Sequence, residues 1–109
     1  MLQQVFIINT DAKMPKGKVA VQVAHGLALY MCDLIKHDNK EKCLEAELMK
    51  KIVLKSTTSE MEELQDKLIS MGINVYCVYD KETNCFTCDC IEPLEEDQNT
   101  NIFGHLELL

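Results

Sequence analysis

Hydrophobic residues gather in four short runs along the chain, and each run has the length of a strand. Apolar and β-branched runs of this kind, bounded by polar segments, are typical of strands in a sheet. The runs lie at Gln4–Asn9, Lys51–Lys55, Ile73–Tyr79 and Phe86–Ile91. We therefore predict four strands in that order.

Helical patterns fill the segments between the first three runs. A long helical stretch extends from Lys18 to about Met49, and the polar residues 37–39 (His-Asp-Asn) predict a break that divides it into two helices. Ser59 and Glu62 have the spacing of a capping box, which predicts the start of a further helix. That helix has an apolar face followed by a glycine stop, formed by Met61, Leu64, Leu68, Met71 and Gly72.

The connections between the predicted strands indicate the topology. Strands joined through helices imply right-handed parallel crossovers, so the first three strands should be parallel. The short link Asp80–Asn84 instead predicts that the third and fourth strands form an antiparallel hairpin. The final segment, Glu95–Leu109, is expected to hold a short helix and a docked tail. The predicted fold class is α/β, a three-layer α/β/α domain with a four-stranded mixed β-sheet.

Length and composition fit a single globular domain. With 109 residues the chain has room for one core, so we predict one domain over residues 1–109. The apolar fraction is 47%, and no run of about 18 apolar residues is present to span a membrane. The N-terminus lacks the charged-then-apolar pattern of a secretory signal. We therefore expect the six cysteines to be reduced thiols in a cytoplasmic protein.

Three of the cysteines form a C-x2-C-x-C cluster, which could hold zinc or could simply belong to a strand. A structural zinc site needs four ligands, so Cys77 or His105 would have to complete the set. Alternation along a strand puts Cys88 and Cys90 on one face and Cys85 on the other, and no second C-x2-C pair is present. We predict that no metal binds and that these cysteines serve as small strand residues.

The segment after the first apolar run carries the clearest candidate chemistry. Lysines flank a glycine where a strand passes into a helix, and a further lysine precedes them, at positions Lys13, Lys16 and Lys18. Positions 18, 22 and 25 follow the i, i+4, i+7 spacing, so Lys18, Gln22 and His25 are expected to share one helix face. A basic loop at a helix N-terminus, beside a polar helix stripe, suits an anionic ligand.

Each of these residues also has a plainer interpretation. The lysines could hold a phosphate or stabilise an oxyanion, but solvated loop lysines would give the same pattern. Gln22 could bind substrate or satisfy neighbouring backbone groups, and a lone helix histidine such as His25 is more often a structural hydrogen-bond partner. A different stripe of the same helix, made of Ala20, Ala24 and Ala28, is expected to pack closely on the sheet.

The net charge of −7 argues against broad contact with a nucleic acid, because nucleic-acid-binding proteins are usually basic, at least locally. The charges are unevenly distributed, however. The segment up to Lys18 contains three lysines and one acid, whereas acids cluster at residues 60–66 and 92–97. A local basic rim of this kind can bind one phosphate group or a few, with strong salt dependence.

Several segments, taken together, resemble the signature of the peptidyl-tRNA hydrolases of the archaeal and eukaryotic type. The first consists of Asp11, Lys13-Met14, Lys16-Gly17-Lys18, Ala20, Gln22 and Ala24-His25. The later ones are Lys50-Lys51-Ile52-Val53-Leu54-Lys55, then Asp80 after the third apolar run, and the closing Gly104-His105-Leu106-Glu107-Leu108-Leu109. Because these pieces occur in the family's order and span nearly the whole chain, the chain is identified as a member of that family.

The resemblance implies a function and a role for each candidate residue. The implied reaction is hydrolysis of the ester between a peptide, or an N-blocked aminoacyl group, and the 3′ ribose of tRNA, by a homodimer without a cofactor. Lys16 or Lys18 would hold phosphate or polarise the ester, and Asp80 would orient the attacking water with help from Thr83. Substrate-binding residues would be Lys13, Gln22 and His25. No nucleophile elbow, P-loop or dinucleotide-binding glycine pattern is present, so a directly attacking water is expected.

The loop after Asp80 departs from the family pattern. In the family, the matching aspartate opens a loop that contains a glycine and a threonine. Here the loop reads Asp80-Lys-Glu-Thr-Asn84, which has no glycine, is several residues shorter and brings Thr83 one position early. An aspartate that caps its own turn would explain the same residues. The alternative function is therefore a catalytically degenerate relative that binds a small ligand or a protein.

Overall fold

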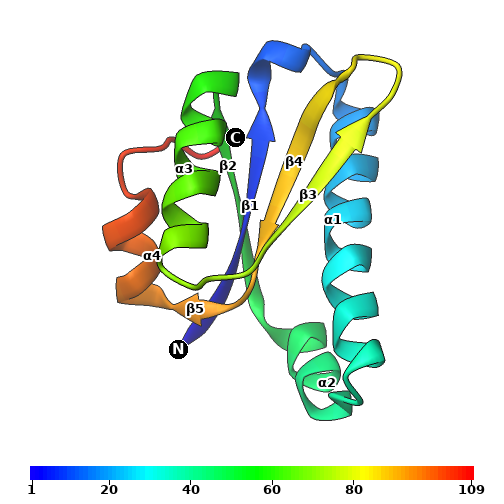
Figure 1. The fold of residues 1–109 in the computed structure, drawn as a ribbon, viewed down its shortest axis with the longest axis vertical. Coiled ribbons are helices and arrows are strands. Elements are labelled where there is room, and N and C mark those ends of the chain that lie inside the picture. Colours follow the sequence, from blue (N-terminus) through cyan, green and yellow to red (C-terminus); the bar gives the residue numbers. More distant parts are fainter.

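The computed structural model describes residues 1–109 and consists of a mixed sheet between two layers of helices (Figure 1). Its strands are β1 (Leu2–Asn9), β2 (Lys50–Ser56), β3 (Val75–Asp80), β4 (Cys85–Ile91) and the short β5 (Leu94–Glu95). Its helices are α1 (Lys16–Lys36), α2 (Lys40–Leu48), α3 (Thr58–Ser70) and α4 (Glu96–Phe103), with a 3₁₀ turn, η1, at Thr10–Ala12. The predicted α/β class, the four main strands and the short helix in the final segment are confirmed.

The sheet has the strand order β2-β1-β4-β3, with β5 added beside β1. β1 is parallel to β2, and β4 is antiparallel both to β1 and to β3. The first three strands therefore run in one direction and β4 runs against them, as the connections predicted. The chain's last residues lie against β2, where Leu108 bridges to Leu54. The sheet thus places the ends of β1 and β3 at the same edge.

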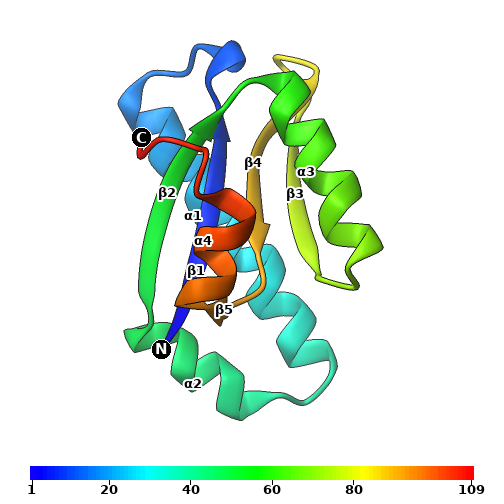
Figure 2. The same ribbon diagram turned by 90° about the vertical axis from the view of Figure 1, so that its left-hand side faces the viewer.

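Helices cover both faces of the sheet (Figure 2). Each face has its own hydrophobic core. Alternate residues of β1 point to opposite sides, so Val5 and Ile7 pack toward α3 and α4. Phe6 and Ile8 pack with residues of α1 and α2. Burial on both faces explains why this strand appears in the sequence as an unbroken apolar run.

The break between α1 and α2 occurs where it was predicted. Asp38 has a φ of 53°, a left-handed conformation that α-helices do not contain, and it separates the two helices. Asn39 then caps α2 by accepting a hydrogen bond from the Lys42 amide. The helix boundaries here follow from local sequence alone.

The predicted capping box of α3 was wrong by two residues. The cap is Thr57, whose side chain accepts from the Glu60 amide while Glu60 accepts from the Thr57 amide. A contact from outside the helix favours this register, because Asp11 accepts a hydrogen bond from the Thr58 amide at 2.8 Å. Met71 was also assigned to the apolar face, but it is 49% exposed because it lies after the helix has ended.

The predicted packing of α1 was wrong as well. Ala20, Ala24 and Ala28 are exposed, whereas the stripe of Gln22, Gly26, Tyr30 and Leu34 is buried. Close approach to the sheet is made by the glycine, because a Cβ at Gly26 would lie 3.1 Å from Cys90 Cβ. The sequence has small residues on two neighbouring stripes of α1, the alanines and Gly26. Only Gly26, which lacks a Cβ, permits this close contact with Cys90. By length and hydropathy α1 could cross a membrane, but here it lies along the sheet (Figure 1).

Candidate functional site

An ion pair joins the first turn of α1 to the end of β3. Lys18 Nζ lies 2.8 Å from Asp80 Oδ2, and the two side chains are only 27% and 14% exposed. A second acid, Glu82, approaches the same ammonium group at 3.5 Å from a side chain that is 86% exposed. The topology creates this pair, because α1 packs across β4 and β3 and so brings its first turn to the end of β3.

The Asp80 carboxylate is also held by its own turn. Thr83 Oγ1 donates to Asp80 Oδ2 at 3.0 Å, and the Glu82 amide donates to Oδ1 at 3.2 Å. Asn84, with a φ of 56°, completes the turn before β4 begins. Asp80 therefore caps its turn and pairs with Lys18 at the same time. The turn-capping interpretation of Asp80 is therefore confirmed, and the cap occurs together with the contact to Lys18.

These contacts fix the charge of both groups. The hydrogen bond from Lys18 is the main cause that lowers the pKa of Asp80 to about 2, and the bonds from Thr83 and the Glu82 amide lower it further. Partial burial acts in the opposite direction. The pKa of Lys18 is raised, mainly by its hydrogen bond to Asp80. At neutral pH the site therefore contains a carboxylate and an ammonium group in contact.

Gln22 lies one turn after Lys18 and is buried at the α1–β4 interface. Its Oε1 accepts a hydrogen bond of 2.6 Å from Thr87 Oγ1, which also lies 3.4 Å from the carbonyl of Val78. Thr87 is completely buried, and the sequence interpretation did not include it. The available signal was its hydroxyl, which lies within a mainly apolar strand and needs a hydrogen-bond partner when buried.

The other predicted site residues lie outside this cluster. Lys13, in the left-handed conformation with φ 50°, and Lys16, the first residue of α1, are both exposed and form no ion pair. Lys16 borders a groove of about 690 Å³ that is otherwise lined mainly by apolar residues between α1 and β2. We predicted that Gln22 and His25 share one face of α1. Gln22 is buried against the sheet whereas His25 is exposed to solvent, so the predicted polar face is divided between the two sides of the helix.

A buried polar network anchors the loop that carries the lysines. Asn9, only 1% exposed, donates to Thr58 Oγ1 and to the Phe86 carbonyl, both at 3.0 Å. Asn9 Oδ1 accepts from the Asp11 amide, and the Asp11 carboxylate accepts from the Thr58 amide. These bonds tie the end of β1 to the start of α3 and to β4. The first residues of the loop between β1 and α1 are therefore held in place by these hydrogen bonds.

The site residues belong to segments that match a known family. Over residues 2–109 the chain matches the model of the family described as Peptidyl-tRNA hydrolase PTH2. The chain belongs to this family. It is 32% identical over 115 residues to the peptidyl-tRNA hydrolase of Thermococcus onnurineus, which covers 98% of this chain and 97% of that protein.

Two further relatives give the same result. The peptidyl-tRNA hydrolase of Sulfolobus acidocaldarius is 30% identical over 120 residues, which cover 99% of this chain and all of the relative. That of Methanothermobacter thermautotrophicus is 30% identical over 116 residues, with 99% and 100% coverage. The PTH2 resemblance found in the sequence is therefore confirmed over essentially the full length.

In this PTH2 member, two of the three clustered cysteines lie in the core. Cys88 and Cys90 are completely buried on the α1 side of β4, and burial raises the pKa of both thiols, that of Cys90 to about 12. Cys85 lies at the start of β4, where its Sγ is 3.3 Å from Thr83 Oγ1. No three His, Cys, Asp or Glu side chains converge in a way that could hold a metal ion.

Proposed function

We propose that the Lys18–Asp80 pair is the catalytic centre of a peptidyl-tRNA hydrolase. The reaction is hydrolysis of the ester between a peptide, or an N-blocked aminoacyl group, and the 3′ ribose of tRNA. The observation that carries this proposal is the 2.8 Å contact between Lys18 and Asp80, which joins residues of two separate signature segments at one partly exposed place. The reaction itself is inferred from the chain's membership of the PTH2 family.

The two charged groups have complementary roles in this reaction. The Asp80 carboxylate accepts a hydrogen bond from a water molecule and directs its lone pair at the ester carbonyl carbon. The Lys18 ammonium donates to the carbonyl oxygen as negative charge develops there. When the tetrahedral intermediate collapses, the bond from the carbonyl carbon to the ribose oxygen breaks. Of the two protons of the attacking water, one ends on the ribose oxygen and the other passes to solvent, so the peptide leaves as a carboxylate.

The low pKa of Asp80 gives it the role of orienting the water, because a carboxylate with a pKa of about 2 is a weak base. Thr83 and the Glu82 amide keep the carboxylate in place through the bonds described above. In this proposal Thr83 takes the role of the threonine that the family has one position later, which is to hold the aspartate that orients the water. The shortened loop is sufficient for this role.

Three exposed residues, Lys13, Lys16 and His25, and the buried Gln22 serve substrate binding. Lys13 and Lys16 form the basic rim that contacts tRNA phosphates. Gln22 Nε2 makes no hydrogen bond within the chain, so it is free to donate to substrate, and His25 lines the solvent side of the same helix. In the cell, the reaction belongs to translation in the cytoplasm.

The chain acts as a homodimer in this proposal. The solvent side of α1 carries an apolar stripe in which Val21, Leu29 and Ile35 are 50%, 44% and 66% exposed. A second copy that covered this stripe would remove it from water, which is favourable in proportion to the apolar area buried.

The proposal is tested by release of free tRNA from an N-acetyl-aminoacyl-tRNA substrate, at low and at moderate salt. Wild-type protein should release tRNA at both, with a higher KM at the higher salt. Binding of uncharged tRNA, measured in parallel, separates recognition from chemistry. A wild-type chain that binds without turnover would instead be the degenerate binding relative.

A further inference from the structure

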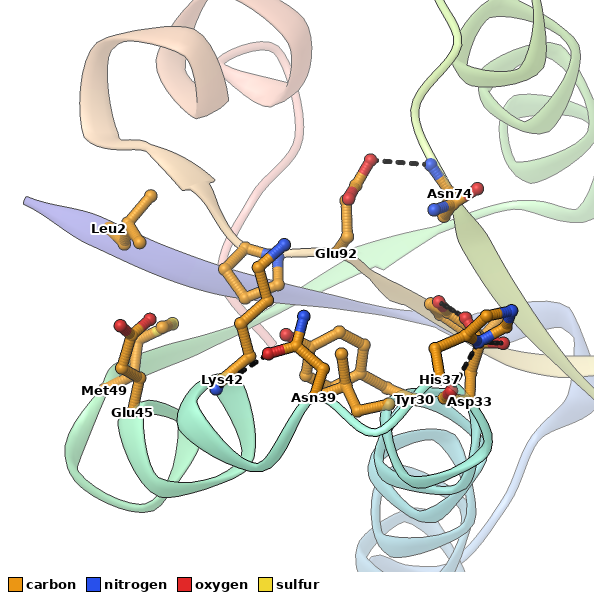
Figure 3. Close-up of a pocket in the computed structure, with 13 residues that line it drawn as sticks. Leu2, Tyr30, Asp33, His37, Asn39, Lys42, Glu45, Met49, Asn74 and Glu92 are labelled. Carbon is orange, nitrogen blue, oxygen red and sulfur yellow. Dashed lines mark hydrogen bonds and ion pairs between the residues drawn. The ribbon is translucent and has the colours of Figure 1, made fainter.

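A cavity of about 450 Å³ (Figure 3) lies near α2, at the end of the sheet opposite the β3–β4 turn that follows Asp80 (Figure 1). Its walls come from the end of α1, from α2, from the beginning of β3 and from the segment after β4. Pockets of roughly 300–1,000 Å³ are the usual size for small-molecule sites. The family resemblance and the proposed reaction make no use of this cavity.

Tyr30 forms the floor of the cavity. The residue is only 3% exposed, and its ring meets the ring of Tyr76 edge-on with centroids 5.6 Å apart. The Tyr76 hydroxyl is engaged, because it donates to Asp33 Oδ2 at 2.6 Å. The Tyr30 hydroxyl has no hydrogen-bond partner in the chain and points into the cavity (Figure 3). Burial raises the pKa of Tyr30 to about 12, so this hydroxyl is a neutral donor at any physiological pH.

Two further donors line the cavity, Asn39 and Lys42. Asn39 uses its Oδ1 to accept from the Lys42 amide at 3.3 Å, which leaves its Nδ2 group free. The Lys42 ammonium has no acid within ion-pair distance, and it extends along the cavity wall (Figure 3). Together with Tyr30, these groups match the requirements of a carboxylate, which accepts several hydrogen bonds at once.

Glu92 provides an acceptor on the facing side. Its Oε1 accepts from the Asn74 amide at 2.9 Å, and its other oxygen has no partner in the chain (Figure 3). Two further acids line the cavity. Asp33 is already engaged by Tyr76 and by His37 at 3.4 Å, whereas Glu45 on α2 makes no ion pair. Glu92 and Glu45 therefore both remain available to a cationic group, and Glu92 is the one that lies outside α2, the helix that carries Lys42.

We propose that this cavity binds a zwitterionic molecule of dipeptide size. Its carboxylate lies against Lys42, Asn39 and Tyr30, and its ammonium group lies against Glu92. A simple anion would meet the Glu92 carboxylate and a simple cation would meet Lys42, so each would leave one wall of the cavity unpaired. The proposal is independent of the hydrolase function, because it uses none of the residues of the Lys18–Asp80 site.

The experiment is a titration of the full chain with glycyl-leucine, followed through its backbone amide NMR signals. The matched control ligand is N-acetyl-glycyl-leucine amide, which has the same side chain and no charges. Glycyl-leucine should shift the amides around Tyr30, Asn39 and Glu92 in a saturable way, and the blocked ligand should bind at least about tenfold more weakly.

Variants assign the contacts. Tyr30→Phe keeps the ring and removes only the hydroxyl, and Glu92→Gln keeps an oxygen for the Asn74 amide. Each of these, and Lys42→Ala, should weaken glycyl-leucine about tenfold without changing the amide spectrum elsewhere. Lys40→Ala, which removes an exposed lysine of the same helix outside the cavity, should bind like wild type.

Three results would overturn the proposal. The first is no saturable shift of the cavity amides with glycyl-leucine. The second is equal binding of the blocked ligand, which would leave the charges without a role. The third is inorganic phosphate that binds the same amides as tightly as glycyl-leucine, which would make the cavity a simple anion site.

Discussion

Thr87 on β4 donates a buried hydrogen bond of 2.6 Å to Gln22 on α1, one turn away from Lys18. This bond fixes the rotation of α1 relative to the sheet at the level of the site. The residues on the outer side of the same turns, such as Ala24 and His25, therefore face solvent. The position of the Lys18 ammonium therefore depends on Thr87, a residue outside the signature segments found in the sequence.

Thr87→Val should destabilise the fold and slow the reaction. The substitution keeps the shape of the side chain but leaves Gln22 Oε1 buried without a donor, which costs about 1–3 kcal/mol. The free energy of unfolding from urea titration measures this loss. Thr100→Val, at an exposed threonine that bonds only within α4, should change it by less than about 0.5 kcal/mol. Equal effects at both positions would contradict the role of the Gln22–Thr87 bond.

Asp80→Asn should reduce turnover at least ~100-fold while the fold is retained. The amide keeps an oxygen for the turn but loses the charge that pairs with Lys18 and orients the water. The readout is the rate of tRNA release, with circular dichroism as the check on folding. Glu82→Gln is the control, because its exposed carboxylate lies 3.5 Å from the same ammonium and should matter little. Undiminished turnover in Asp80→Asn would remove this residue from the mechanism.

Replacing Lys16 and Lys18 together with alanine should abolish tRNA binding. Wild-type affinity should fall steeply as salt rises, and loss of phosphate contacts should flatten that dependence. Fluorescence anisotropy of labelled tRNA at several salt concentrations gives both the affinity and the slope. Lys67→Ala, at an exposed lysine of α3, removes the same charge from another part of the surface and should leave both unchanged. If the double variant binds as wild type does, tRNA contacts a different surface.

Asp89→Asn should stabilise the protein at pH 8. Asp89 is completely buried, and burial is the main cause that raises its pKa to about 6, although hydrogen bonds from Gln65 and Cys77 act against this. In the unfolded chain its pKa is about 3.9. Below that value both states are protonated, so the wild type loses stability between about pH 4 and pH 6 as the unfolded chain ionises first. By linkage the loss approaches about 3 kcal/mol.

The asparagine variant removes this pH dependence and keeps an acceptor for Gln65, which bonds both Asp89 oxygens at 3.0 and 2.9 Å. Urea unfolding of both proteins at pH 4.5 and pH 8 measures the difference, and all other groups cancel in the comparison. A variant that is less stable than wild type at pH 8 would mean that the ionised Asp89 stabilises the fold.

Gly26→Ala should destabilise the protein, although alanine is the better helix former by about 1 kcal/mol. The added Cβ would meet Cys90 Cβ at 3.1 Å and Cys88 Sγ at 3.6 Å, and strand atoms in a packed core cannot easily move away. Gly17→Ala is the matched control, because nothing lies within 4 Å of a Cβ there. Thermal unfolding should therefore show a lower Tm for Gly26→Ala and an equal or higher Tm for Gly17→Ala.

The sequence predicted the fold well because its strongest patterns are local. The apolar run of β1, the break before Asn39 and the short β3–β4 link each determine their own structure. Two errors arose where a distant contact decides between equivalent local patterns. Thr57–Glu60 and Ser59–Glu62 have the same spacing, and Asp11 favours the first of them. Likewise, only contact with Cys90 shows which stripe of α1 faces the sheet.

The candidate site was predictable only in part, for the same reason. Lys18 and Asp80 could be named from their segments, but their contact depends on α1 packing across β4 and β3. The bond between Gln22 and Thr87 depends on β4 lying between β1 and β3, an order that adjacent residues do not encode. Lys16 and His25 have suitable chemistry in suitable spacing, yet they lie outside the cluster around Asp80.

The position of β1 has a consequence for how the chain reaches this structure. A ribosome makes β1 before β2 and β4, but Phe6 pairs with Val53 of β2 on one side and with Cys90 of β4 on the other. Until Cys90 has been synthesised, one side of this apolar strand has no partner and can pair with other chains instead. The sheet therefore closes only after β4 has been made, through contacts between residues distant in the sequence, and contacts of this kind slow folding.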